Sequence, residues 1–191
     1  MSGNGKNGEL DGLVAELLAV ASDASKVFGG LSAAQLNWKP SAEQWSVGQC
    51  FDHLIVTNST FFPAIEKVAA GTFKSSLWGR VSPLSGFFGR YILDALDPAK
   101  GRKIRAPRAF LPAESDVDAE VIGRFVANLS EVAARMRATR GVDLRRTVIT
   151  SPAMALVTYS LFDVYRIFVA HGRGHFEQAR RVTQSAGFPN G

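Results

Sequence analysis

The sequence predicts an all-α fold in which four long helices form a bundle. Four stretches of about 20 residues carry apolar side chains at helical spacing, and helices with one apolar face bury that face against one another. No stretch alternates apolar and polar residues as a half-buried strand does. Two long connections, residues 72–114 and 142–158, separate the second, third and fourth helices.

The first helix is expected from about Leu10 to Phe28, where two glycines end it. The residues expected to face the core are Leu13, Leu17, Val20, Ala24 and Val27. Residues 1–8 are polar and rich in Gly and Asn, which predicts a disordered leader. Residues 9–187 are then expected to form a single domain, because a chain of 191 residues fits one hydrophobic core.

The second helix is expected to begin after Ser46, because Ser46 and Gln49 form a capping box. It runs to Gly71, and Pro63 is expected to kink or crowd it, since proline removes one backbone hydrogen bond. Its buried face comprises Val47, Cys50, Leu54, Thr57, Phe61, Ala64 and Val68. Another capping box at residues 32–35 predicts a short helix before it.

Two further helices complete the predicted bundle. The third is expected from Ser115 or Asp116 to Arg140, and the fourth from Tyr159 to Ala186. The third is expected to turn Val121, Phe125, Leu129, Val132 and Met136 inward. The fourth is expected to turn Leu161, Val164, Ile167, Phe168, His171, His175, Gln178, Ala179 and Val182 inward.

Composition and charge exclude several classes of protein. The net charge is +5, but the basic clusters are not interleaved with aromatic residues, so we expect a solvated surface and no nucleic-acid partner. No run approaches 18 uninterrupted apolar residues, so no membrane span is expected. The single cysteine, Cys50, excludes an intrachain disulfide and fits a reducing compartment, which predicts a cytoplasmic protein.

The chain has only three histidines, and their positions suit a metal ion. His171 and His175 are four residues apart on the fourth helix, so they share one face with Cβ atoms about 5–6 Å apart. His53 lies on the second helix, which can supply a third nitrogen. Three protein ligands leave coordination positions open, as in catalytic rather than structural sites. The alternative is that these are ordinary core or surface histidines without a ligand.

Two motifs in the sequence resemble those of the DinB-like superfamily. Residues 31–40 (LSAAQLNWKP) and 45–54 (WSVGQCFDHL) resemble its N-terminal signature, and residues 171–178 (HGRGHFEQ) resemble its C-terminal one. The resemblance covers about Leu10 to Val182 and implies a four-helix bundle with a long crossover connection. It also implies a divalent metal, zinc or nickel, bound by three histidines, which match His53, His171 and His175 in this chain.

Two features depart from the pattern of this family. Similar sequences often carry Arg where this chain has Gly174, and Gly172 lies in the same turn. We interpret these glycines as allowing close helix packing, with room for a ligand beside the metal as the alternative. The carboxylates nearest to the histidines on the same predicted helices are Asp52, Asp163 and Glu177. Helical phase does not place any of them beside the histidines, so no general acid or base is assigned.

The resemblance implies a metal-dependent enzyme acting on a small-molecule substrate. Members of the family include transferases or isomerases that use a low-molecular-weight thiol, such as bacillithiol or mycothiol, and this is the function we expect. Metal-dependent hydrolase activity is the alternative, as is a non-catalytic, stress-linked, metal-holding protein. A fourth ligand from Cys50, one turn before His53, would favour a structural or storage role. A homodimer is compatible with these functions.

The connection from Gly71 to Glu114 is expected to form part of the wall of the site. It is long for a link between two helices, and such segments are often functional. It is also rich in aromatic residues, which suit an apolar pocket. We therefore expect one or more of these residues to lie near His53: Phe73, Trp78, Phe87, Phe88 and Tyr91.

Overall fold

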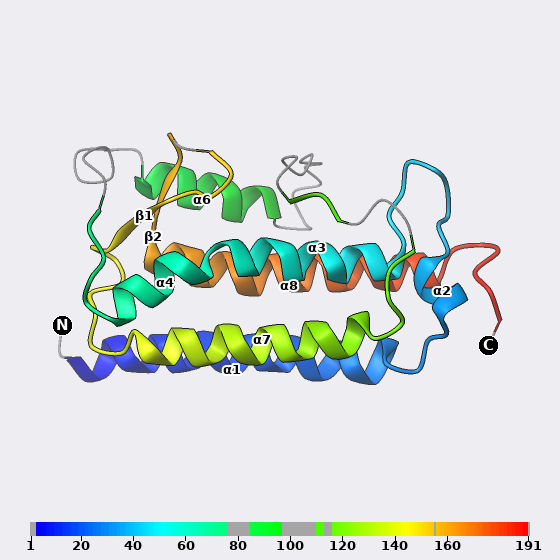
Figure 1. Ribbon diagram of the computed structural model, residues 1–191, viewed down its shortest axis with the longest axis horizontal. Helices are drawn as coiled ribbons and strands as arrows, with labels where there is room; N and C mark the ends of the chain where they lie inside the picture. Colours follow the sequence, from blue (N-terminus) through cyan, green and yellow to red (C-terminus); the bar gives the residue numbers. More distant parts are fainter. Residues whose placement is uncertain (1–2, 76–84, 97–109, 113–115, 155, 191) are drawn as a thin grey trace.

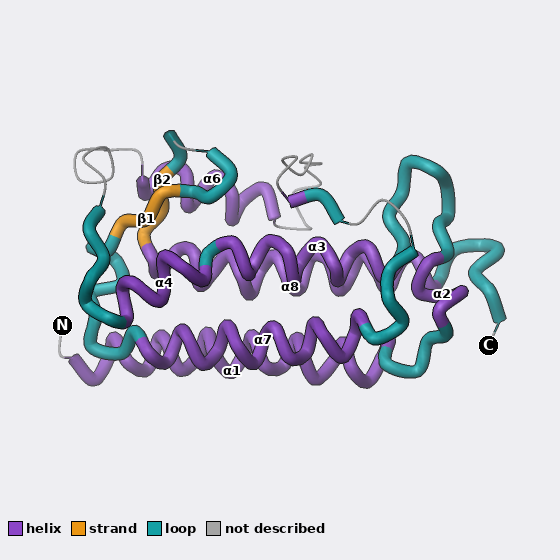
Figure 2. The backbone as a smooth tube through the Cα atoms, viewed as in Figure 1, coloured by secondary structure: helices purple, strands orange, loops and turns teal. Residues whose placement is uncertain are grey.

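The computed structural model describes residues 3–75, 85–96, 110–112, 116–154 and 156–190. Its helices are α1 (Gly3–Phe28), α2 (Ala33–Asn37), α3 (Val47–Thr60), α4 (Phe62–Ala69), α6 (Ser85–Leu96), α7 (Val121–Ala138) and α8 (Leu161–Thr183), and its strands are β1 (Val148–Thr150) and β2 (Thr158–Ser160). The described chain is mostly helical with little strand (Figure 2), so the prediction of an all-α fold is confirmed.

The long helices lie side by side along the long axis of the molecule (Figure 1). Helix α1 contacts α7 and α8, and α3 contacts the same two helices, so each shares its apolar face with two neighbours. Helices α3 and α8 run in opposite directions, as the colours in Figure 1 show. This pairing brings the first two turns of α3 beside the C-terminal half of α8.

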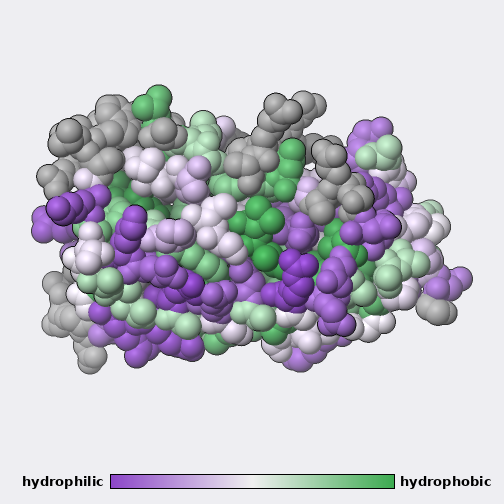
Figure 3. All heavy atoms as spheres, viewed as in Figure 1, coloured by the Kyte–Doolittle hydropathy of each residue, from purple (hydrophilic) through white to green (hydrophobic). Residues whose placement is uncertain are grey.

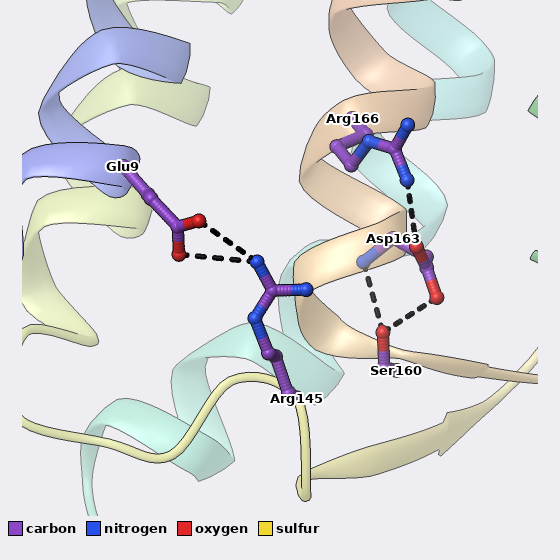
Figure 4. Close-up of polar contacts among 5 residues, drawn as sticks. All are labelled: Glu9, Arg145, Ser160, Asp163 and Arg166. Carbon is purple, nitrogen blue, oxygen red and sulfur yellow. Dashed lines mark hydrogen bonds and ion pairs between the residues drawn. The ribbon is translucent and has the colours of Figure 1, made fainter. Parts of the chain in front are cut away.

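Helix α1 begins at Gly3, ahead of the expected start near Leu10. Its first turns are tied to the connection after α7, because Arg145 Nη2 lies 2.9 Å from Glu9 Oε1 (Figure 4) and Arg140 pairs with Asp11. These long-range contacts hold a segment whose composition alone disfavours helix. The division into a leader at residues 1–8 and a domain at residues 9–187 stays a prediction.

The helix expected from Val47 to Gly71 is two helices. Helix α3 ends at Thr60 and α4 begins at Phe62, so Pro63 lies in the first turn of α4. Proline is tolerated there because the backbone N–H groups of a first turn have no helical acceptor. Helices α7 and α8 are shorter than expected. Helix α7 begins at Val121 rather than at residue 115 or 116, and α8 spans Leu161–Thr183.

A two-stranded antiparallel hairpin precedes α8, and the sequence did not predict it. Strands β1 and β2 pair Ile149 with Tyr159, and each is three residues long. Three residues are too few to show a period of two. Helix α6 packs on β2 and on the start of α8, where a Cβ on Gly89 would lie 2.8 Å from Asp163 Oδ2. Glycine is therefore required for this close approach.

The core lies between the long helices and is mainly apolar. Aromatic rings link three helices, because the Phe51 centroid lies 5.2 Å from that of Phe28 and 4.9 Å from that of Phe125. Hydrophilic side chains cover much of the lower part of the face shown in Figure 3, where α7 lies in Figure 1. Among the described residues, no helix is both long enough and apolar enough to cross a membrane.

Candidate metal centre

His53 is positioned by the start of α3. The side chain of Ser46 accepts a hydrogen bond from the backbone of Gln49, and the Gln49 side chain accepts one from the backbone of Ser46, as the capping box predicts. This reciprocal cap fixes the first turn of α3, and His53 follows in its second turn. Its side chain is buried, at 3% exposure.

The three histidines converge between α3 and α8. His171 Nε2 lies 3.1 Å from His53 Nε2 and 3.0 Å from His175 Nε2. One ligand atom from each residue lies within 4.8 Å of those of the other two. The spacing of four residues puts the two α8 histidines on the face that meets α3, as expected from helical geometry. These residues could therefore hold one metal ion.

A backbone carbonyl sets the tautomer of His53. His53 Nδ1 donates a hydrogen bond to the carbonyl oxygen of Phe110, which can only accept. The proton of a neutral ring is therefore on Nδ1, and Nε2 presents its lone pair to the other two histidines. Metal-binding histidines commonly donate their second nitrogen to such an acceptor. The sequence could not reveal Phe110, because a carbonyl contact leaves no side-chain signal.

All three histidines are held neutral at physiological pH. Burial lowers the pKa of His53, although the Phe110 carbonyl and Asp52 act in the opposite direction. Burial, with the charges of His175 and His53, lowers the pKa of His171 well below its ordinary value. Burial and the charge of His53 lower the pKa of His175 to about 3. Neutral imidazole is the form that binds metal.

The indole of Trp45 covers one side of the cluster. Its ring centroid lies 4.9 Å from that of His53 and 5.6 Å from that of His175, and it is nearly parallel to the His175 ring, at 18°. His175 Nδ1 is buried without a hydrogen-bond partner. Gln178 is near enough to raise the His175 pKa slightly, but it makes no hydrogen bond of ordinary geometry to Nδ1. The motif contained Trp45, but no role was predicted for it.

No further ligand joins the cluster among the described residues. Cys50 is fully buried, and burial raises the pKa of its thiol to about 12, so it stays protonated. It does not group with the histidines, nor does any described aspartate or glutamate. Asp163 instead accepts a hydrogen bond from the Ser160 hydroxyl at the start of α8 (Figure 4), and Glu177 pairs with Arg180. The closed four-ligand site is not supported.

Within the described residues, the long connection reaches the cluster through the backbone of Phe110. Phe73 packs on the core just after α4, and Tyr91 on α6 is 47% exposed. Trp78 and the side chains of Phe87 and Phe88 lie outside the described residues. Two cavities in the described part lie elsewhere, one between α1 and the connection after α7 and the other between α1 and α8. An open pocket at the histidines stays a prediction.

Gly172 faces α1 rather than the histidine cluster. A Cβ at this position would lie 3.4 Å from Val20 Cγ1, which is close to the limit of ordinary contact. The interpretation that this glycine allows close packing of α8 on α1 is therefore supported. Gly174 is half-buried in the same turn.

The donor set fits a divalent ion. Nitrogens that each lie about 2.0–2.1 Å from one ion are about 3.0–3.4 Å apart, and the two measured separations, 3.1 and 3.0 Å, agree with this. Neutral imidazoles whose Nε2 lone pairs point to one place can donate those lone pairs to a cation there. Fold and site thus define a mostly helical protein with a three-histidine cluster suited to a metal.

Comparison with protein families agrees with this class. The sequence profile of the DinB superfamily matches residues 16–179, which is most of the chain. The protein therefore belongs to the DinB superfamily. Comparison with curated proteins gave no match, and comparison with solved structures gave none.

Proposed function

We propose that this protein is a metal-dependent enzyme that holds zinc or nickel through His53, His171 and His175. The observation that supports the proposal is the convergence of three neutral imidazoles on Nε2, with separations of 3.0 and 3.1 Å. The proposed fold is the four-helix bundle with long crossover connections that the resemblance implied. The helix directions and pairings agree with it.

A low-molecular-weight thiol is the co-substrate that the site favours. When bound, an ion with three neutral ligands keeps its full charge and lowers the pKa of a thiol or a water. A water-dependent reaction normally also needs a general base, and no described carboxylate belongs to the group of ligand atoms that the three histidines form. A thiolate is itself a nucleophile and needs no such base. We therefore propose a thiol-dependent transferase or isomerase acting on small molecules.

Hydrolysis of an ester or amide is the second candidate, because the same ion would also lower the pKa of a bound water. The hydrogen bond from His53 Nδ1 to the Phe110 carbonyl orients a metal ligand and would serve either reaction. Homodimerisation and location in the cytoplasm stay predictions.

Metal content tests the proposal first. The purified protein should bind one zinc or nickel ion per chain, measured by plasma mass spectrometry after dialysis. His171→Ala should lose nearly all of this metal, because His171 lies between the other two ligands. Arg180→Ala, on the exposed side of the same helix, is the matched control and should keep it. Unchanged metal content in His171→Ala would overturn the proposal.

Turnover then separates the two chemistries. The loaded protein, given a thiol and an electrophilic small molecule, should form the thiol conjugate, measured by liquid chromatography with mass detection. Cleavage of activated esters without any thiol would favour the hydrolase instead. Both activities should disappear in His171→Ala.

A further inference from the structure

Two of the histidines are held in place by different means. His53 is oriented by the hydrogen bond from its Nδ1 to the Phe110 carbonyl. His175 Nδ1 is buried without a partner at hydrogen-bond geometry, although the Gln178 side chain is close enough to raise the pKa of the ring. The final side-chain torsion of histidine is broad, so a ring without a well-formed second contact can turn away from a ligand. A contact with the face of the His175 ring would restrict this rotation.

Trp45 makes the contact that meets this need. Its indole is nearly parallel to the His175 ring, at 18° with centroids 5.6 Å apart, which is an offset-stacked arrangement. Rotation of the His175 ring about its Cβ–Cγ bond would break this stack. The same indole meets His53 at a steeper angle, 52°, so it does not lie flat against that ring.

The backbone at Trp45 is itself fixed. Trp45 directly precedes Ser46, whose capping box with Gln49 closes the start of α3. The indole is therefore carried by the same rigid helix start that carries His53, and it reaches across to α8. Withdrawal of electron density by a bound cation makes the His175 ring more attractive to the electron-rich indole face.

From these contacts we propose that Trp45 is a positioning residue that holds His175 for metal binding by stacking, as the Phe110 carbonyl holds His53 by a hydrogen bond. The inference rests on the proposed function, since it concerns a ligand of the same ion. Trp45 contributes to the affinity of the site for metal and takes no part in the chemical reaction.

Cobalt binding tests the inference apart from activity. Co²⁺ is titrated into metal-free protein, and its visible spectrum reports both affinity and ligand set. Trp45→Leu should weaken Co²⁺ binding about 10–100-fold, as losses of outer-shell contacts do. Trp45→Phe keeps a smaller ring and should fall between this variant and the wild type. Trp38→Leu is the matched control, because Trp38 is also half-buried but packs on Phe188, and its affinity should be unchanged.

A double-mutant cycle identifies the residue through which Trp45 acts. If Trp45 positions His175, its replacement should have little further effect in the His175→Ala background, so the two losses should not add. Additive losses would overturn the inference, as would unchanged Co²⁺ affinity in Trp45→Leu. Should Trp45→Leu fail to fold by circular dichroism, the cycle is run with Trp45→Phe and read in the same way. A wild-type protein that binds no Co²⁺ would overturn the proposed function itself and the inference with it.

Discussion

The ionisable side chains of two regions of this fold have different partners. Those around α1 form exposed ion pairs, and those between α3 and α8 are neutral rings packed together. On the surface, Glu9 and Glu16 pair with Arg145 and Arg173 at 2.9 and 3.0 Å, and each of these side chains is about half exposed. In the interior, the ligand nitrogens of the three histidines face one another, and no described carboxylate joins their group. The first set consists of ion pairs, and the second consists of neutral rings.

The buried cluster of neutral rings is the one that indicates a function. Exposed ion pairs contribute about 0–1 kcal/mol each and often serve only to orient elements. Burying titratable groups without a counter-charge lowers stability, because they must stay neutral or draw a partner from outside. A fold that keeps such a cluster gives up stability where it needs a ligand.

Metal should stabilise the protein, and only through the interior cluster. With free zinc at 100 times its dissociation constant, the free energy of unfolding should rise by about 2.7 kcal/mol. For a chain of this length the midpoint of thermal unfolding should then rise by roughly 5–10 °C. Calorimetry with and without zinc measures the rise, which His171→Ala should abolish. An equal rise in that variant would place the ion elsewhere.

The metal-free protein should lose stability as the pH falls from about 6.5. The pKa values of the three histidines are lowered in the folded state, to about 3 for His175. Below their ordinary value of about 6.5 the unfolded chain therefore takes up protons that the folded chain does not. Stability conferred by the neutral rings is thus complete above pH 6.5 and decreases toward lower pH, with His175 contributing on the order of 2 kcal/mol by pH 5.

Urea unfolding between pH 7.5 and 5.0 measures this loss, since carboxylates contribute little in that range. His175→Gln, which cannot titrate, should flatten the pH dependence. Metal occupancy of the folded protein should fall only below this range, as the pH approaches the lowered pKa values of the rings, about 3 for His175, because protons and metal then compete for the same nitrogens. A stability that does not change with pH in the metal-free wild type would mean that the histidines are not buried as described.

The sequence was sufficient for those features that repeat or carry a motif. Helical periodicity predicted the long helices, and the capping box at Ser46 is present with both of its hydrogen bonds. The motifs predicted His53, His171 and His175 as one set of metal ligands. Spacing works here because an interval of four residues fixes a face of a helix whatever its surroundings.

Features that depend on tertiary contacts could not be predicted in this way. The carbonyl of Phe110 acts through the backbone, so its side chain gives no sign of the role. The role of Trp45 appears only once α3 and α8 are packed, because its partner is 130 positions later in the chain. The early start of α1 is accompanied by the contact of Glu9 with Arg145, which lies 136 positions later in the chain. The hairpin strands are too short for a periodic signal.

The smallest expected effect belongs to the surface pair of Glu9 and Arg145. Glu9→Gln should lower the free energy of unfolding by less than about 1 kcal/mol, because both side chains are about half exposed. Arg145→Ala should cost somewhat more, since the guanidinium also lies 3.8 Å above the Phe162 ring, a contact of about 0.5–1 kcal/mol at exposed sites. Urea unfolding in low and in 1 M salt separates these contributions, because salt screens the ion pair and leaves the packing of the arginine on the ring. The Glu9→Gln effect should vanish in high salt, and part of the Arg145→Ala effect should remain. A Glu9→Gln loss above about 2 kcal/mol that persists in salt would show that the α1 pairs support the fold as strongly as buried contacts do, and the contrast with the histidine cluster would then no longer hold.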